Sequence, residues 1–329
     1  MTPLLRKIKR RLGIYYYGVK KRRKTNQSFK IDLQRLLRFF LAFQKIDNNK
    51  DSLRCKIMLL NHQLEKAQTY KKAKEGYGKE KIRELIASLI YYNKQFGRDD
   101  IFSVSIGVIE SHLNNPHSYK DENIIKSIEE LLSLKNINEG GGTILYDSKV
   151  IPKINNFDAF LNSRRSCRRY SKEDITEQEI KTAVKLAQTA PSACNRQPVR
   201  IHVYKDKEVI KNLILSQRAD VEWCLDATAL IVITTNQYYY RDYLERTQYM
   251  FDAGLFSMNL NLILHNMGIG SCFKMAQNDP DIEKETKEIG NIPDFENICV
   301  LYCIGKYPKD PFVVAKSQRI ELDNVLKIH

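Results

Sequence analysis

Four arginines and one serine stand together near the middle of the chain, in the sequence RRSCRR at residues 164–169. Guanidinium groups carry forked N–H donors that match phosphate oxygens, and a serine hydroxyl adds a further hydrogen bond. These residue types in this spacing therefore indicate an anion site, with phosphate the best match. The alternative is a solvated surface loop, which is the commoner setting of an arginine-rich segment.

A second polar segment, APSACNRQP, occupies residues 190–198. Pro191 and Pro198 restrict the backbone, while Ser192, Asn195 and Gln197 offer donors and acceptors from a rigid loop. Such a loop is suited to hydrogen-bonding a heterocycle. The alternative is that the two prolines only stop the preceding helix.

A third segment, MGIGSCFKMA, occupies residues 267–276 after a long apolar stretch. Gly268 and Gly270 would let the backbone approach a ligand closely, because neither residue has a Cβ atom. The competing interpretation is an ordinary glycine at the end of a helix.

The remaining chemistry-bearing residues form no recognisable catalytic or metal-binding set. The six histidines are scattered, and we interpret His202 and His265 as structural. The seven cysteines are odd in number and form no CxxC pair, which favours free thiols in a reducing cytosol over a disulfide framework or a zinc site. Cys167 and Cys194 are interpreted as small filler residues of their loops. We therefore predict no catalytic side chain and no metal ligand.

Hydrophobic periodicity predicts the elements that must position these segments. In the C-terminal half it predicts helices over residues 157–162, 176–189 and 250–266 and strands over residues 200–204, 229–235 and 298–305. Thr176 and Glu179 have the spacing of a capping box at the start of the second helix. Helices and strands mix without a regular βαβ period, so the sequence predicts an α+β domain over residues 153–329.

The N-terminal half has a different pattern, since apolar residues recur at helical spacing throughout residues 28–137. Ile82, Leu85, Leu89, Tyr92 and Phe96 form one such stripe. We predict an all-α domain there, with apolar stripes that form its core. The glycines at 140–142 predict a linker over residues 138–152, because a glycine run does not continue a helix.

Length and charge support this division. A chain of 329 residues with 43% hydrophobic residues suits two globular domains, and no apolar run is long enough to span a bilayer. The net charge of +15 lies almost wholly in the N-terminal half, and residues 1–24 carry ten Lys and Arg with no acid. This basic, aromatic arm is a solvated tail, a contact for an anionic membrane surface or a nucleic-acid contact, with nucleic acid the least favoured.

The three chemical segments, in this order and combination, resemble the FMN-dependent nitroreductase family. The resemblance rests on Arg-Arg-Ser-x-Arg, then Pro-Ser-x-x-Asn-x-Gln-Pro after a helix, then Gly-x-Gly-Ser after a longer helix. It covers about residues 155–320 and does not include the first 150 residues. It implies a mixed sheet flanked by helices, preceded here by the all-α region.

The resemblance also implies which residues bind FMN, and it assigns them to four groups. The phosphate and ribityl contacts are Arg164, Ser166 and Arg168, with the backbone of Arg165. The loop along the flavin is Pro191, Ser192 and Asn195, which in the family usually comes from the partner subunit of a homodimer. The stretch over the isoalloxazine is Phe273, Lys274 and Met275, and the late basic element is Lys316, Ser317 and Arg319. Phe273 departs from the family, which often has Trp nearby, and residues 236–249 resemble no substrate pocket of the family.

The function implied is an FMN-dependent oxidoreductase in which NAD(P)H is the co-substrate and a small nitro compound, quinone or enone is the acceptor. The flavin would carry the chemistry. The expected protein is a cytoplasmic homodimer, held at the inner face of a membrane if residues 1–24 bind there. The alternative is a membrane-surface or assembly protein whose nitroreductase-like half binds flavin without turnover.

Overall fold

The computed structural model describes most of the chain but not its N-terminal arm. The described residues are 30, 32–34, 37, 49–69, 75–132, 140–143, 155–218, 222–241, 243–277, 279–315, 317 and 322–329. The basic arm at residues 1–24 therefore lies outside them. Within the described part of the chain, no helix combines the length and the apolar character needed to cross a membrane.

The N-terminal region is helical, as predicted. It consists of α2 (Lys50–Gln68), α3 (Lys79–Phe96), α4 (Asp100–Asn114) and α5 (Glu122–Leu132). The predicted stripe on α3 lies inside this bundle, where Ile82, Leu85, Leu89 and Tyr92 are fully buried. Apolar side chains from all four helices are buried against one another, and they give this region a hydrophobic core of its own.

The described part of the predicted linker packs against α4. The amide of Gly141 donates to the carbonyl of Val104 at 2.9 Å. A Cβ atom on Gly107 would lie only 2.5 Å from the Cα atom of Gly140, so the two backbones need glycine where they meet. The glycine run therefore serves close packing at this point, in addition to ending a helix.

The C-terminal region is an α+β domain built on one four-stranded sheet. Its strands are β1 (Val199–Tyr204), β2 (Ala229–Asn236), β3 (Ile269–Met275) and β4 (Glu296–Lys306). Its helices are α6 (Phe157–Ser163), α7 (Glu177–Ala187), α8 (Lys207–Ser216), α9 (Glu222–Leu225), α10 (Gln248–Asn266) and α11 (Pro280–Gly290). The strand order is β1-β2-β4-β3, and all three pairings within this sheet are antiparallel, so the described strands form an antiparallel sheet where the sequence predicted a mixed one.

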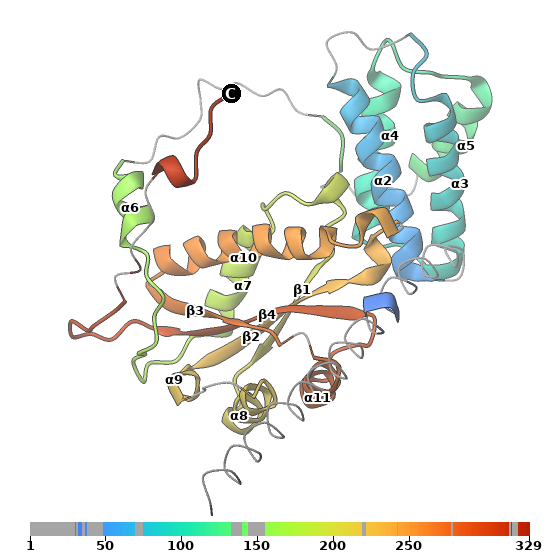
Figure 1. The fold of residues 1–329 in the computed structure, drawn as a ribbon. Coiled ribbons are helices and arrows are strands. Elements are labelled where there is room, and N and C mark those ends of the chain that lie inside the picture. Colours follow the sequence, from blue (N-terminus) through green and yellow to red (C-terminus); the bar gives the residue numbers. More distant parts are fainter. Residues whose placement is uncertain are drawn as a thin grey trace, which may run out of the picture.

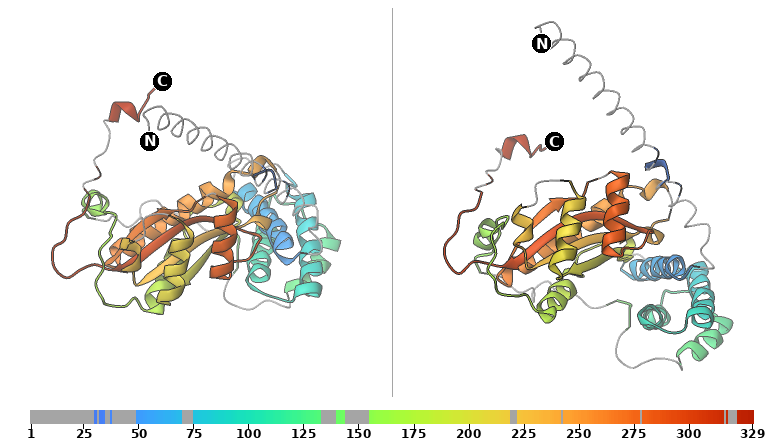
Figure 2. Two further views of the ribbon diagram at one scale, coloured as in Figure 1. Left: turned by 60° about the horizontal axis from the view of Figure 1, so that its bottom comes forward. Right: turned by 90° about the horizontal axis from the view of Figure 1, so that it is seen from below.

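Helices cover both faces of the sheet (Figure 1 and Figure 2). Strand β2 is buried along its whole length, and its side chains alternate between two cores. Ile231 and Ile233 face the core that includes α7 and α10, while Leu230 and Val232 face the core that includes α8. This burial on both faces explains the continuous β-branched run that predicted the strand.

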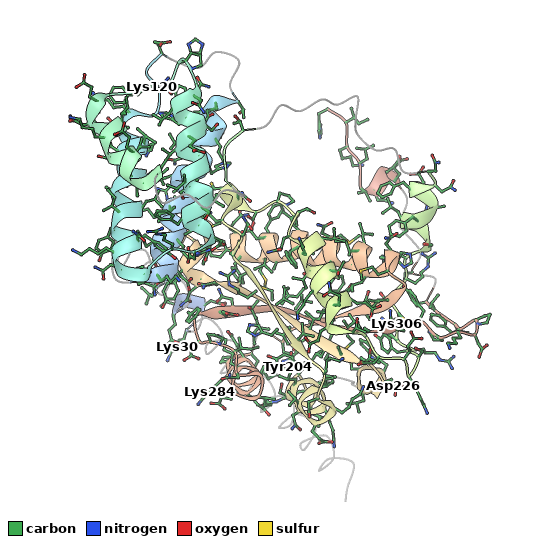
Figure 3. The ribbon with its side chains drawn as sticks, turned by 180° about the vertical axis from the view of Figure 1, so that it is seen from behind. Lys30, Lys120, Tyr204, Asp226, Lys284 and Lys306 are labelled. Carbon is green, nitrogen blue, oxygen red and sulfur yellow. The ribbon has the colours of Figure 1, made fainter. Side chains whose placement is uncertain are left out.

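Local sequence signals account for several element boundaries. Thr176 and Glu179 form the predicted capping box at the start of α7. Lys306 lies at the end of β4 (Figure 3). It forms an ion pair with Glu179 and so joins this helix start to the sheet. Four elements were not predicted, namely β3, α8, α9 and α11.

The helical region contacts the α+β domain through α2. Helix α2 packs against two short 3-10 turns, η3 (Ala193–Asn195) and η4 (Gln237–Tyr239). At this contact the side-chain amide of Asn236 donates to the carboxylate of Asp51 at 2.8 Å. The helical region therefore lies directly beside the second chemical segment (Figure 1).

Candidate functional site

The arginine segment follows α6 and runs along the outer edge of β3. The amide of Cys167 donates to the carbonyl of Ser271 at 2.8 Å. A Cβ atom on Gly270 would lie 2.7 Å from the sulfur of Cys167, so glycine is needed at this position for the segment to sit against the strand. Gly270 therefore positions the arginine segment, whereas Gly268 has a left-handed φ of 72° and ends α10.

The predicted phosphate-binding side chains lie along this edge. The guanidinium of Arg168 stacks over the ring of Trp223 at 5.5 Å, and Ser166 is within hydrogen-bonding reach of Cys272. Arg165 donates to the carbonyl of Arg164 at 2.9 Å. Arg164, Arg165 and Arg168 form no ion pair with any described carboxylate, so their charges are not neutralised within the described chain.

Arg164 lies close to a histidine that joins three elements. The ring nitrogens of His265 lie 2.8 Å from Ser163 Oγ and 2.9 Å from the hydroxyl of Tyr307. Burial lowers the pKa of His265, and the positive charge of Arg164 lowers it further. His265 is thus held in its neutral form beside the arginine segment, which agrees with the structural role expected from the sequence.

Strand β3 brings the predicted flavin stretch to the same edge. Phe273 and Met275 are 39% and 71% exposed, while Lys274, on the opposite face of the strand, is only 7% exposed. Lys274 forms no ion pair with a described carboxylate. Because the carbonyl of Ser271 points to the outer edge, alternation directs the amides of Phe273 and Met275 to that edge too. The backbone amides of Phe273 and Met275 and the ammonium of Lys274 therefore lie beside the arginine segment.

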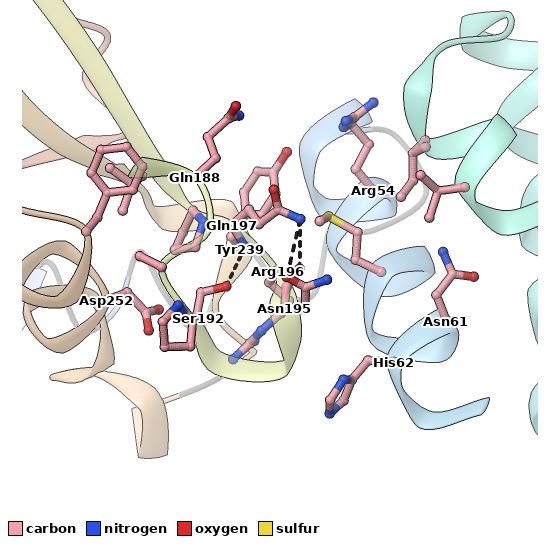
Figure 4. Close-up of a pocket in the computed structure, with 18 of the residues that line it drawn as sticks. Arg54, Asn61, His62, Gln188, Ser192, Asn195, Arg196, Gln197, Tyr239 and Asp252 are labelled. Carbon is pink, nitrogen blue, oxygen red and sulfur yellow. Dashed lines mark hydrogen bonds between the residues drawn. The ribbon is translucent and has the colours of Figure 1, made fainter. Parts of the chain in front are cut away.

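The loop at residues 191–197 has an unusual backbone. Cys194, Asn195 and Gln197 all have left-handed φ values between 52° and 53°, although none is glycine. The amide of Gln197 donates to Ser192 Oγ at 3.0 Å and closes the loop (Figure 4). Such conformations persist only where the surroundings impose them, and they concentrate at binding sites.

Two buried side chains impose this loop conformation, and sequence reasoning missed both. Asp252, on α10, is 1% exposed and accepts a hydrogen bond from the amide of Ala193 at 3.1 Å. Arg196 is also 1% exposed, and its two terminal nitrogens bind the carboxylate of Glu245 at 2.8 and 3.0 Å. The sequence offered only a weak signal for the ion pair of Arg196 and Glu245. Arg196 lies in the second polar segment, and Glu245 follows 49 residues later.

The predicted site residues do not all meet within one chain. The arginine segment and Phe273–Met275 lie at the β3 edge of the sheet, whereas the loop with Pro191, Ser192 and Asn195 leads into β1 at the opposite edge. Lys316 and Arg319 lie outside the described residues. Ser317 is described and has a left-handed φ of 49°.

The fold and these segments define an α+β domain with an unneutralised basic edge and a rigid polar loop at the other edge. The nitroreductase family profile matches residues 161–306. A protein of Archaeoglobus fulgidus, named as an NADH dehydrogenase/NAD(P)H nitroreductase, is 31% identical over 154 residues, which cover 45% of this chain and 83% of that protein. The chain therefore belongs to the nitroreductase family through its C-terminal half.

Two bacterial proteins of known structure match the C-terminal half of this chain. An FMN-dependent nitroreductase from Clostridium difficile R20291 is 22% identical, with a TM-score of 0.45, and the match covers 53% of this chain and 99% of that one. A nitroreductase family protein from Streptococcus pneumoniae TIGR4 is 19% identical, with a TM-score of 0.44, and the match covers 53% and 100% of the two chains. Helices α2–α5 precede the residues that the family profile matches.

Proposed function

We propose that this protein is an FMN-dependent oxidoreductase that takes hydride from NAD(P)H and delivers it to a small nitro, quinone or enone acceptor. The observation that carries this proposal is the group of cations at the β3 edge. Arg164, Arg165, Arg168 and the shielded Lys274 all lack a described carboxylate partner. A bound phosphate and an electron-rich ring edge would supply the missing negative charge.

The described residues fit FMN. Arg164, Ser166 and Arg168 would hold the phosphate and ribityl hydroxyls, while the edge amides of Phe273 and Met275 and the ammonium of Lys274 would face the ring. When bound, FMN supplies the two-electron hydride chemistry. The chain's own residues position the ring, supply hydrogen bonds to it and exclude water from one side of it.

A homodimer would complete this site. Since the loop with Ser192 and Asn195 lies at the far edge of the sheet, its partner in flavin binding would be the arginine segment of a second copy. Helix α10 presents an apolar face beside this loop, where Met250, Phe251 and Met258 are 46%, 62% and 45% exposed. A face of this kind is suited to burial in a two-fold interface.

Titration with FMN tests the assignment of the arginine segment. Replacing Arg164 or Arg168 with alanine removes a charge-assisted hydrogen bond, so we expect the Kd for FMN to rise about tenfold to a hundredfold. Arg98→Ala is the matched control, because Arg98 is exposed and lies in the helical region. Unchanged affinity in both Arg164→Ala and Arg168→Ala would contradict the assignment.

Mixing two defective variants tests the shared site. Arg168→Ala and Asn195→Ala damage different halves of the proposed site, so a mixed dimer would contain one doubly altered site and one intact site. Random exchange of subunits would restore about a quarter of the sites to the wild-type state. Recovery of NAD(P)H oxidation on mixing is the expected result, and no recovery despite measured subunit exchange would refute the shared site.

A further inference from the structure

A cavity of about 290 Å³ lies between the helical region and the rigid loop (Figure 4). Helices α2 and α4 form one wall, with Arg54, Met58, Asn61 and Val104 among their lining residues. The segment from Gln188 to Arg200 forms the other wall. The first wall precedes residues 161–306, so the family profile does not account for it. The volume is close to the lower end of the range for small-molecule pockets.

Polar contacts hold the two walls together. Arg54 is bound to Asp99 and Asp100 at 2.8 and 2.9 Å and lies near Tyr239 across the contact between the regions, where the side-chain amide of Asn236 donates to Asp51 at 2.8 Å. Tyr239 is 3% exposed and belongs to the turn against which α2 packs. The cavity is therefore a fixed feature of the contact between the two halves.

Arg200 differs from the other lining arginines in its partners. Its guanidinium lies 4.9 Å from the ring centroid of Tyr239 and donates to the carbonyls of Gln197 and Val199 at 3.1 and 2.9 Å. Arg54 and Arg196, the other two lining arginines, are bound to carboxylates, whereas Arg200 forms no ion pair with any described residue and interacts with the Glu296 carboxylate only at longer range. A guanidinium oriented by a ring and two carbonyls retains N–H donors for an anion.

The other lining groups favour a flat, partly apolar ligand. Met58, Ile101, Val104 and Pro191 supply apolar surface. Asn61 is 4% exposed, and while its amide nitrogen donates to Ser105 Oγ at 2.9 Å, its carbonyl oxygen has no partner among the described residues. Each of the three acidic lining residues already has a partner: Asp100 pairs with Arg54 at 2.9 Å, Asp252 accepts from the Ala193 amide at 3.1 Å, and Glu65 accepts from the Gly142 amide at 2.8 Å.

We infer that this cavity binds the acceptor of the reaction, and that the acceptor is a small planar molecule that carries a carboxylate. The carboxylate would pair with Arg200, while the planar body would lie between the apolar wall and the loop that borders the flavin. This inference rests on the proposed function, because the loop at residues 191–195 is placed beside the flavin only there. It gives the helical region a role as one wall of the substrate site.

Binding measurements with two probes test the inference without relying on turnover. Calorimetric titration of the FMN-loaded full-length protein would compare 4-nitrobenzoate with its neutral analogue 4-nitrobenzamide. We expect the carboxylate to bind about tenfold more tightly, which is the effect of one charge-assisted hydrogen bond. Arg200→Met should remove this preference, Arg200→Lys should retain part of it, and the exposed control Arg98→Met should leave it unchanged.

Three results would overturn the inference: equal affinity for the two probes, a preference that survives Arg200→Met, or loss of FMN instead of the probe in Arg200→Met. The last result would make the cavity part of the flavin site. Failure of the proposed function is a separate outcome, because wild-type protein would then bind no FMN or would hold FMN that NAD(P)H does not reduce. A preference for 4-nitrobenzoate that depends on Arg200 in such protein would still support the carboxylate site.

Discussion

Replacing Asp252 with alanine should destabilise the α+β domain by removing the main support of the rigid loop. The carboxylate of Asp252 accepts hydrogen bonds from the Ala193 amide, the Tyr240 hydroxyl and the Gln248 side chain at 3.1, 3.1 and 3.0 Å. Tyr240 is only 1% exposed, so water does not readily replace the lost acceptor. Hydrogen bonds to a charged group contribute about 1.5 to 3 kcal/mol each, whereas Gln248 can turn toward solvent. We therefore expect Asp252→Ala to lower the free energy of unfolding by about 3 kcal/mol.

Urea unfolding followed by the fluorescence of Trp223 measures this effect, because Trp223 is the single tryptophan of the chain and packs against the core that includes α8. Asp252→Asn keeps an acceptor for the Ala193 amide, so its loss should be smaller, about 1 kcal/mol. Glu173→Ala is the matched control, since Glu173 is an exposed acid in a loop. An Asp252→Ala protein as stable as the wild type, within about 0.5 kcal/mol, would refute this explanation of the loop.

Further predictions concern other parts of the molecule. Gly270→Ala should weaken FMN binding, since the new Cβ would lie 2.7 Å from the Cys167 sulfur and displace the arginine segment; an unchanged Kd would count against this packing. Arg164→Ala should raise the pKa of His265, whose pKa is lowered first by burial and then by the Arg164 charge, and an NMR titration of the imidazole would detect it. Burial alone would raise the pKa of Glu296, but hydrogen bonds from His202 and Thr234 lower it on balance. The Glu296 carboxylate therefore stabilises the folded state at pH values above 4.5, its ordinary pKa, and this contribution is lost as the pH falls toward the lowered pKa. Glu296→Gln should therefore flatten the acid side of a stability profile. Phe251→Lys should give a monomer that does not retain FMN, as sedimentation and absorbance would show.

Short-range signals predicted most of the fold. The apolar stripe on α3 gave a correct helix because its residues became the core of the bundle. Likewise, the Thr176 and Glu179 capping pair marked the start of α7. The β-branched run at 229–235 became the central strand β2, which is buried on both faces. In each case the signal lies in residues close together in sequence.

The missed elements had weaker or misleading signals. Strand β3 begins with the sequence IGSC, which has little strand propensity, and its glycine was attributed to a helix end or a ligand contact. In fact Gly270 is needed by a packing contact with Cys167, about a hundred residues earlier in the chain. Helix α11 did carry an available signal, since Asp279 caps it and Pro280 occupies its first turn.

The cavity could not be predicted from the sequence, because it depends on contacts between distant segments. Arg54 meets Tyr239 across the boundary between the two regions, and no local pattern links these residues. The sequence also could not show that Arg200 lacks an ion-pair partner, since only the structure shows which lining arginines are bound to carboxylates. Motif order indicated the residues for flavin binding, whereas the contribution of the helical region required three-dimensional placement.

Reduction of the bound flavin tests the central claim most directly. The purified full-length protein, loaded with FMN and kept free of oxygen, would be mixed with NADH or NADPH while the visible flavin absorption is recorded. We predict that one of these co-substrates bleaches the flavin absorption, and that a quinone such as menadione restores it in the wild type. Protein that binds no FMN, or whose bound FMN neither co-substrate reduces, would contradict the assignment as an NAD(P)H-dependent flavin oxidoreductase.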